Sequence, residues 1–154
     1  MMNQRPTQSL AGARFRGLLI IWGAQILSLV IFFALMQMIS STGHAEGSQP
    51  LLLALAATAL VAFGLSFVMK SKLLAQAARE RRPDLVTTAY IIAFALCEAC
   101  ALFGLLAHFT TGAREALYFF IPAALGFLLH FPRRRHFDDA DANNGAGQGF
   151  KSTF

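Results

Sequence analysis

Four apolar runs, each close to the length of a membrane-spanning helix, constrain this chain more than any other feature of its sequence. The runs are 17–39, 50–69, 87–109 and 116–131; with histidine counted as neutral, Glu98 is the only charged residue inside them, and Pro122 interrupts the last and shortest run. A helix crosses the roughly 30 Å hydrocarbon core of a bilayer with about 20 residues. We therefore predict an all-α, polytopic membrane protein with four transmembrane helices. The predicted spans are about 17–39, 50–70, 87–109 and 114–131.

The composition agrees with this class and leaves no residues for a separate water-soluble domain. Hydrophobic residues make up 56% of the chain and charged residues 14%, against about 25% charged residues in ordinary soluble domains. We expect an N-terminal segment at 1–16 and a transmembrane domain at 17–132. Residues 133–154 would form a basic flank followed by a polar, disordered C-terminal tail.

Lys and Arg alternate between the connections, which predicts the orientation. They flank the first run on its N-terminal side, fill the connection between the second and third runs, and follow the fourth. Arg114 is the only one on the opposite side. The positive-inside rule then places both termini in the cytoplasm. We expect a bacterial inner (plasma) membrane protein whose net charge of +5 reflects topology, with no nucleic-acid partner.

The first run has a second interpretation. It follows Arg14 and Arg16, and it precedes Thr42-Gly43-His44-Ala45, which resembles a signal-peptidase site. The apolar region of a signal peptide is about 7–15 residues long, and this run is longer. A retained anchor is therefore the preferred interpretation, and cleavage is the alternative.

The connection after the second run is rich in Ala, Gln, Glu and Arg, which form helices well. We predict that the second helix continues to about Arg82 and ends because Pro83 cannot continue it. Thr87 or Thr88 would then cap the third helix. Arg81, Arg82 and Pro83 form a candidate docking surface for a cytoplasmic partner. The alternative is a solvated helical turn without a partner.

Small residues recur at four-residue spacing in the third run, and such residues let helices approach closely in lipid. Cys97 belongs to this pattern with Ala93 and Ala101, Cys100 lies beside it, and the two cysteines form a C-x-x-C motif. Structural zinc sites need four ligands, but His108 and His130 are expected at span ends. We interpret the cysteines as packing residues and predict no metal, no cofactor and no catalytic residues.

Glu98 lies at the centre of the predicted third span. A charge there costs at least about 2.5–3.5 kcal/mol on insertion scales, and the chain has no cation at that depth. Gln25, Ser28 and Thr58 are neutral polar residues near the centres of the other spans. We expect Glu98 to be protonated at neutral pH and to form a hydrogen bond with one or more of them. It would be either a structural link between helices or a reversible H⁺ or Na⁺ site.

Residues 73–109 resemble the proteolipid, subunit c, of rotary ATP synthases. That family has a helical hairpin with a cytoplasmic Arg-x-Pro-type turn and a carboxylate at the centre of its second helix. The resemblance implies that Glu98 is an ion-binding carboxylate. Unlike the family, this chain has a further apolar run on each side of the hairpin. The matching positions are Arg81, Arg82 and Pro83 in the turn, and Glu98, Ala99, Gly104 and Leu105 in the helix.

Two functional hypotheses follow. The first is an integral membrane protein with a proteolipid-like hairpin that binds H⁺ or Na⁺ at Glu98. The second is an accessory or assembly subunit of a larger membrane complex, without ion chemistry. An enzyme would need several converging polar groups, so we predict a non-enzymatic protein. Its partners would be the lipid bilayer and either other membrane subunits or copies of itself.

Overall fold

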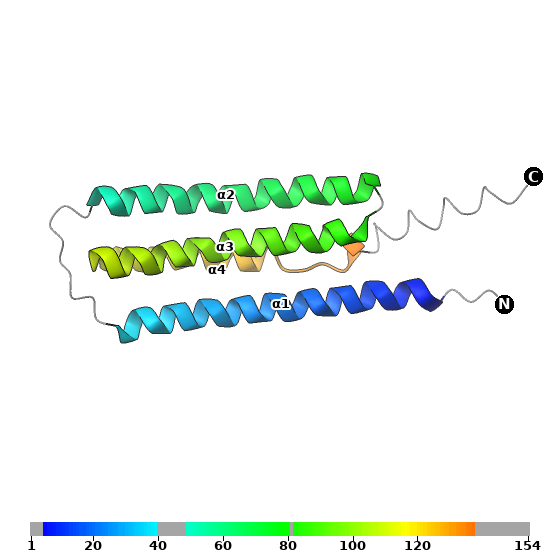
Figure 1. Cartoon of the computed structure of the whole chain (residues 1–154), viewed down its shortest axis with the longest axis horizontal. Coiled ribbons are helices and arrows are strands. Elements are labelled where there is room, and N and C mark those ends of the chain that lie inside the picture. Colours follow the sequence, from blue (N-terminus) through cyan, green and yellow to red (C-terminus); the bar gives the residue numbers. More distant parts are fainter. Residues whose placement is uncertain (1–4, 40–48, 81, 138–154) are drawn as a thin grey trace, which may run out of the picture.

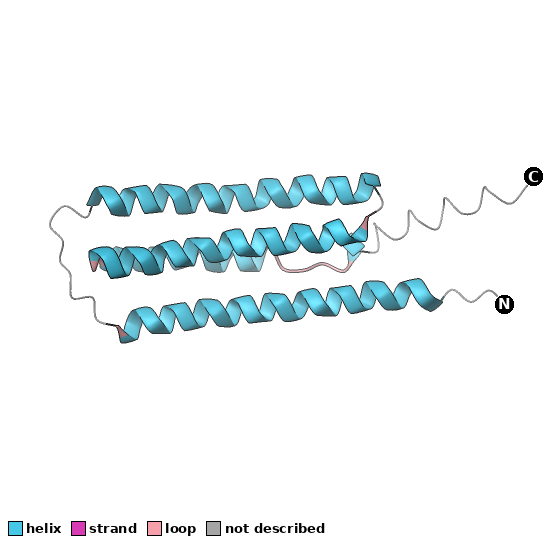
Figure 2. Cartoon of the chain, viewed as in Figure 1, coloured by secondary structure: helices cyan, strands magenta, loops and turns pink. Residues whose placement is uncertain are grey.

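A computed structural model of the chain describes residues 5–39, 49–80 and 82–137, and within these ranges the regular structure is helical (Figure 2). The expected tail at 138–154, the signal-peptidase-like sequence and Arg81 lie outside the described residues. So does the start of the N-terminal segment. The elements, labelled in Figure 1 except for η1, are α1 (Arg5–Met38), α2 (Gln49–Glu80), α3 (Pro83–Thr111), the 3₁₀-helix η1 (Arg114–Phe119) and α4 (Phe120–Leu129).

Three of these helices are long and apolar enough to cross a membrane. The qualifying stretches are Gly12–Met38, Gln49–Glu80 and Pro83–Thr111. Their length and composition confirm the all-α class and support a membrane protein. At about 1.5 Å per residue, the 32 residues of α2 also exceed the thickness of the hydrocarbon core.

The fourth segment differs from the continuous helix predicted over 114–131. It consists of six residues of 3₁₀-helix followed by ten residues of α-helix, and α4 alone is only about 15 Å long. Pro122 lies in the first turn of α4 rather than in the middle of a helix. Proline lacks an amide hydrogen and clashes with the preceding turn, so it is tolerated only in the first turn of an α-helix. The α-helix accordingly begins at Phe120, two residues before Pro122. Beyond Leu129 the chain continues in non-helical form through Arg133.

The helices form a bundle in which α3 is central. Figure 1 shows α3 between α2 and α1, with α4 behind it. The start of α1, the turn between α2 and α3, and residues 135–137 all lie at one end of the bundle. The described chain therefore traverses the bundle four times, although its last traversal is not one continuous helix.

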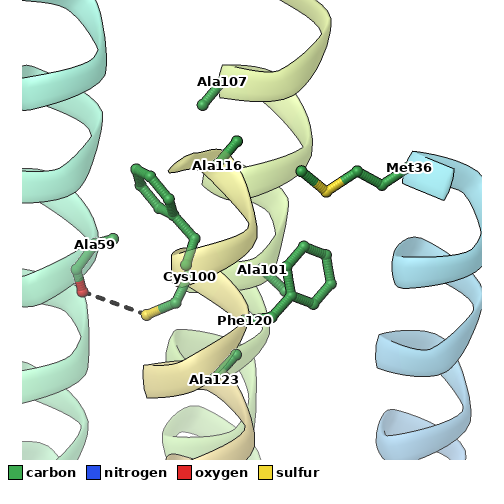
Figure 3. Packing of buried hydrophobic residues seen from close by; sticks show 9 residues of the cluster. Met36, Ala59, Cys100, Ala101, Ala107, Ala116, Phe120 and Ala123 are labelled. Carbon is green, nitrogen blue, oxygen red and sulfur yellow. Dashed lines mark hydrogen bonds between the residues drawn. The ribbon is translucent and has the colours of Figure 1, made fainter. Parts of the chain in front are cut away.

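Small residues on α3 bring its neighbours close, as the four-residue pattern predicted. Ala93, Cys97 and Ala101 are fully buried. A Cβ atom added at Gly104 would lie 2.7 Å from Phe119 Cβ, and one added at Gly126 of α4 would overlap Cys97 Sγ. Both glycines are therefore required by close contacts between segments. Figure 3 shows the cluster that includes Met36, Ala59, Cys100, Ala101, Ala107, Ala116, Phe120 and Ala123.

Large apolar side chains remain exposed on α1, α2 and α4. Water-soluble monomers rarely leave contiguous apolar surface of this extent uncovered, whereas lipid-facing helices do. Helix α1 is the clearest example, because few of its side chains are buried. Its exposed large apolar residues are Ile20, Leu27, Val30, Ile31, Phe33, Leu35 and Met38.

The turn between α2 and α3 is short. Helix α2 ends at Glu80, and α3 begins at Pro83, one turn earlier than the predicted caps Thr87 and Thr88. That capping prediction was wrong because proline is well suited to the first helical position, where its missing N–H would have no partner. The hydroxyl of Thr88 instead donates to the carbonyl of Asp84 within the first turn.

Candidate functional site

Two side-chain contacts join the three long helices at the level where their predicted spans are centred. Ser28 of α1 bonds to Glu98 of α3, and Cys100 Sγ of α3 donates to the carbonyl of Ala59 in α2, at 3.3 Å. Residue 28 is the midpoint of the predicted first span, and Ala59 lies beside the midpoint of the second. These contacts therefore place Glu98 at the level where the three apolar stretches are centred.

The carboxyl of Glu98 lies between α1 and α3. Ser28 Oγ donates to Glu98 Oε1 at 2.6 Å, and both side chains are half-buried. Hydrogen bonds of this length are typical of strong O–H···O contacts. Glu98 is next to the packing face around Cys97, one step of about 100° round the helix. The carboxyl therefore has one hydrogen-bond donor and also reaches the bundle surface.

The other two candidate partners do not contact Glu98. Thr58 is exposed, and its hydroxyl donates to the carbonyl of Ala54 in its own helix, at 2.8 Å. Gln25 is half-buried on α1 and has no side-chain hydrogen bond within the described part of the chain. The structure therefore brings together Ser28 and Glu98, but not the complete predicted set.

A second polar cluster lies where α4 ends. Ser66 of α2 and His130 are buried, with exposed fractions of 0% and 1%. His130 Nε2 lies 3.0 Å from Ser66 Oγ, and His130 Nδ1 lies 3.4 Å from Lys70 Nζ. The sulfur of Cys97 is 3.9 Å from the same serine oxygen. Residues from α2, α3 and the end of α4 thus form one connected polar cluster.

The hydrogen-bond directions in this cluster follow from counting protons. Ser66 Oγ donates its single proton to the carbonyl of Phe63, at 2.6 Å, so it accepts from His130 Nε2. The ammonium of Lys70 can only donate, so His130 Nδ1 accepts. His130 is then a neutral imidazole with its proton on Nε2. It cannot act as a base toward Ser66, and the cluster is not a serine nucleophile with its histidine.

Tyr90 of α3 connects this cluster to the non-helical segment after α4. Its ring is fully buried, and Lys70 Nζ lies 4.3 Å from the ring centroid. Its hydroxyl accepts the backbone N–H of Arg133 at 3.2 Å and lies 2.8 Å from His136 Nδ1. Trp22 of α1 likewise donates to the backbone carbonyl of Phe127 at 3.1 Å. These side chains satisfy backbone groups that a continuous helix would have paired.

The sequence predicts His130 at a span end, and the structure places it where α4 ends, beside Ser66 and Lys70 of α2. The sequence prediction assumed helical rise through residue 131, whereas α4 ends at Leu129 and a non-helical segment completes the traversal. His130 is consequently beside Ser66 and near Cys97. The sequence does contain a signal for this arrangement. His130 and Tyr90 are polar residues that must find hydrogen-bond partners if they are buried, and Pro132 prevents the helix from continuing.

Cys97 and Cys100 are free thiols buried in the helix packing. The described residues contain no group of three or more His, Cys, Asp or Glu side chains that could hold a metal ion. Cys100 Sγ donates to backbone carbonyls of α2 and of its own helix. The C-x-x-C pair therefore contributes to the contacts of α3 with its neighbours.

The candidate docking surface is an exposed turn. Arg82 donates to Asp84 at 2.8 Å and lies 3.8 Å from Glu80. The Arg82 guanidinium hydrogen bond lowers the pKa of the Asp84 carboxyl, and the same bond raises the pKa of Arg82. Pro83 begins α3, and Arg81 is not among the described residues. Exposed ion pairs of this kind contribute little to stability.

At the opposite end of the bundle, a half-open pocket of about 800 Å³ lies between α1, α3 and η1. His108 is one of its lining residues, and its Nε2 donates to the carbonyl of Ile39 at 3.3 Å. His108 Nδ1 is buried and has no hydrogen-bond partner among the described residues. Arg114 and Glu115 also line the pocket, so it has neither a purely cationic nor a purely anionic character.

Comparisons of the chain with protein-family models, with curated proteins and with solved structures returned no match.

Proposed function

We propose that this protein is a multi-pass integral membrane protein that binds H⁺ reversibly at Glu98. Helices α2 and α3 would form its proteolipid-like hairpin, and α1 would supply the hydrogen-bond donor Ser28. The protein would reside in a bacterial inner membrane, with both termini and the α2–α3 turn in the cytoplasm. It would act without enzymatic chemistry, alone or with other membrane subunits.

The Ser28–Glu98 hydrogen bond is the observation that carries this proposal. It joins two different helices at the centres of their predicted spans, at 2.6 Å. An ionisable residue at such a depth marks a functional site by default. The carboxyl is only half-buried, so it lies at the edge of the packing between α1 and α3 rather than in a sealed core.

A proton fits this site better than a sodium ion. Hard cations take several oxygen ligands, and Ser28 is the only side chain among the described residues that bonds to Glu98. A protonated carboxyl needs no such shell. One donor and one acceptor satisfy it, and its neutral form avoids the cost of a charge in hydrocarbon.

The proposed orientation rests on charge and on the shape of the bundle. The start of α1, the α2–α3 turn and residues 135–137 share one end (Figure 1), and nearly all the basic residues of the sequence belong to that end. The fourth crossing would consist of η1, α4 and the segment through Phe137. Buried Pro132 and Phe137 support this route, because non-helical backbone in a membrane must be covered by protein.

Carbodiimide labelling of the purified, lipid-reconstituted protein tests the proposal. Carbodiimides attack protonated carboxyls in apolar surroundings, so labelling of Glu98 should fall as the pH rises. Glu98→Gln supplies the background, because glutamine keeps the hydrogen-bonding capacity and removes the reactive group. Addition of Na⁺ at fixed pH should leave the labelling unchanged, and protection by Na⁺ would assign the site to sodium instead.

Failure of labelling at every pH would refute reversible proton binding. Glu98 would then be a sealed link between α1 and α3, worth only about 0.6 kcal/mol by comparison with measured interhelical hydrogen bonds. The remaining candidate would be an accessory or assembly subunit of a larger complex. In that case Glu98→Gln would also leave cellular function unchanged.

A further inference from the structure

Two basic residues at one end of the bundle contact Tyr90, whereas others at that end, such as Lys72 and Arg82, are exposed. Lys70 Nζ lies over the face of the ring, 4.3 Å from its centroid, and the backbone N–H of Arg133 bonds to the hydroxyl. Arg135 follows two residues later in the same C-terminal flank and is exposed. Lys70 of α2 and Arg133 of the flank therefore meet at one buried ring, and Arg135 is close to them in sequence.

This cationic cluster, defined as Lys70, Arg133 and Arg135, has no counter-anion in the described part of the chain. The salt bridges found there join Arg82 to Glu80 and Asp84 in the exposed turn. Glu98 bonds to Ser28, and the remaining described carboxylate, on Glu115, lines the pocket at the other end of the bundle. Lys70 meets only a neutral imidazole and an aromatic face. Its ammonium retains donors for a further acceptor.

The depth of Lys70 identifies the environment of the cluster. Lys70 is 20 residues after Pro50 along one continuous helix, so about 30 Å separates them. That distance equals the thickness of the hydrocarbon core, so a membrane centred on the predicted span 50–70 places Lys70 among the lipid headgroups. Arg133 and Arg135 are exposed at the same end. Phosphate is the anion that this layer provides at high density.

We propose that the cationic cluster binds the phosphate headgroup of an anionic phospholipid. Lys70 would donate to the phosphate oxygens from α2, and the guanidinium groups of Arg133 and Arg135 would donate from the flank. Arginine suits this role because its planar fork matches phosphate geometry, and basic pockets between helices on the cytoplasmic side bind such headgroups. The inference depends on the proposed membrane placement, but it is independent of proton binding at Glu98.

The test measures lipid selectivity in phosphatidylcholine vesicles that contain the full-length protein. Spin-labelled phosphatidylglycerol and spin-labelled phosphatidylcholine, each at trace level, report the fraction of lipid immobilised by the protein. We expect phosphatidylglycerol to be preferred about fivefold for each charge it contacts. Equal immobilisation of the two lipids would overturn the proposal.

Matched variants show whether the selectivity belongs to this site. Lys70→Gln and, separately, Arg133→Gln should each lower the preference about fivefold. Lys72→Gln removes the same charge from an exposed side chain that lies only about 3 Å further along α2 and some 200° round it, and it should have no effect. An equal loss in the Lys72 variant would indicate diffuse attraction, and the proposal would fail. Arg133 is exposed, so its variant tests the site even if the Lys70 variant folds poorly.

Three further measurements distinguish a bound headgroup from soluble phosphate, from the acidic tail and from Glu98. Inorganic phosphate should not lower the preference more than chloride does at equal ionic strength, and a loss specific to phosphate would assign the cluster to soluble phosphate.

Asp138, Asp139 and Asp141 follow the cluster in sequence, outside the described residues. Changing all three to Asn should leave the preference unchanged, and a large gain would identify the tail as the counter-anion. Glu98→Gln should retain the preference, which separates this test from that of the proposed function.

Discussion

Replacing Gly126 with alanine would test the close contact between α3 and α4. The new methyl group would overlap Cys97 Sγ and lie 3.1 Å from Cys97 Cβ and 3.5 Å from Phe63 Cε2. Overpacking of a core costs up to about 3 kcal/mol, and the overlap with both atoms of a short side chain places this variant near that limit. Alanine returns about 1 kcal/mol through its helix propensity. The free energy of unfolding should therefore fall by about 2 kcal/mol.

Two comparisons isolate the cause of that loss. Gly64 lies within α2 with no atom within 4 Å of an added Cβ, so Gly64→Ala should be neutral or stabilising by up to about 1 kcal/mol. Cys97→Ala removes the overlapping sulfur. In the double variant, Gly126→Ala should cost at least about 1 kcal/mol less than it does alone, which is a measurable coupling for side chains in contact.

Reversible unfolding in mixed micelles, followed by circular dichroism as the denaturing detergent is increased, would give these free energies. The reasoning is refuted if Gly126→Ala is as stable as Gly64→Ala. It is also refuted if the effects of Gly126→Ala and Cys97→Ala are additive, because the overlap would then not be the source of the loss.

Three other predictions concern the polar contacts. Trp22→Phe removes the donor to the carbonyl at the end of α4 and should lower the free energy of unfolding by about 1 kcal/mol, measured in the same detergent titration. Tyr90→Phe removes the acceptor of the partly buried N–H of Arg133 and should cost about 1 kcal/mol. It should also deprotect that amide in hydrogen exchange, whereas an unchanged exchange rate would contradict the assigned bond. Arg82 lowers the pKa of Asp84. The pair therefore contributes fully to the stability of the folded state above the ordinary carboxyl pKa of about 3.9. That contribution is lost as the pH falls through the lowered pKa. In Arg82→Gln, the pKa of Asp84, measured from its carboxyl resonance in an NMR titration, should rise toward that ordinary value.

The depth of each residue was predictable from the sequence because a bilayer of one thickness fixes the centre of every apolar run. Counting along each run placed Glu98 and Ser28 at the same level, and the two side chains meet there. Depth alone does not give the direction in which a side chain points. Thr58 has nearly the right depth, but its hydroxyl bonds within α2.

The fourth traversal was not predictable by the same count, because the count assumed a rise of 1.5 Å for every residue. A 3₁₀-helix rises about 2.0 Å per residue, and extended chain rises about 3.3 Å. Pro122 and Pro132 divide the segment into such pieces, so fewer residues cover the same distance. His130 is therefore held inside the bundle beside Ser66, and the polar cluster around it had no counterpart in the sequence analysis.

The length of α2 separates two electrostatic environments along one rigid rod. The helix continues ten residues past Lys70 to Glu80, a distance of about 15 Å. The Debye length at physiological ionic strength is about 8 Å, so with Lys70 at the proposed headgroup level the membrane surface potential would be largely screened at Arg79 and Arg82. In the proposed placement, Lys70 would experience the full surface potential of the lipid headgroups, and the turn would experience only a small part of it. Changes in the anionic lipid content of the membrane would act on α2 around Lys70, whereas soluble anions and proteins would contact the end of α2 near Glu80.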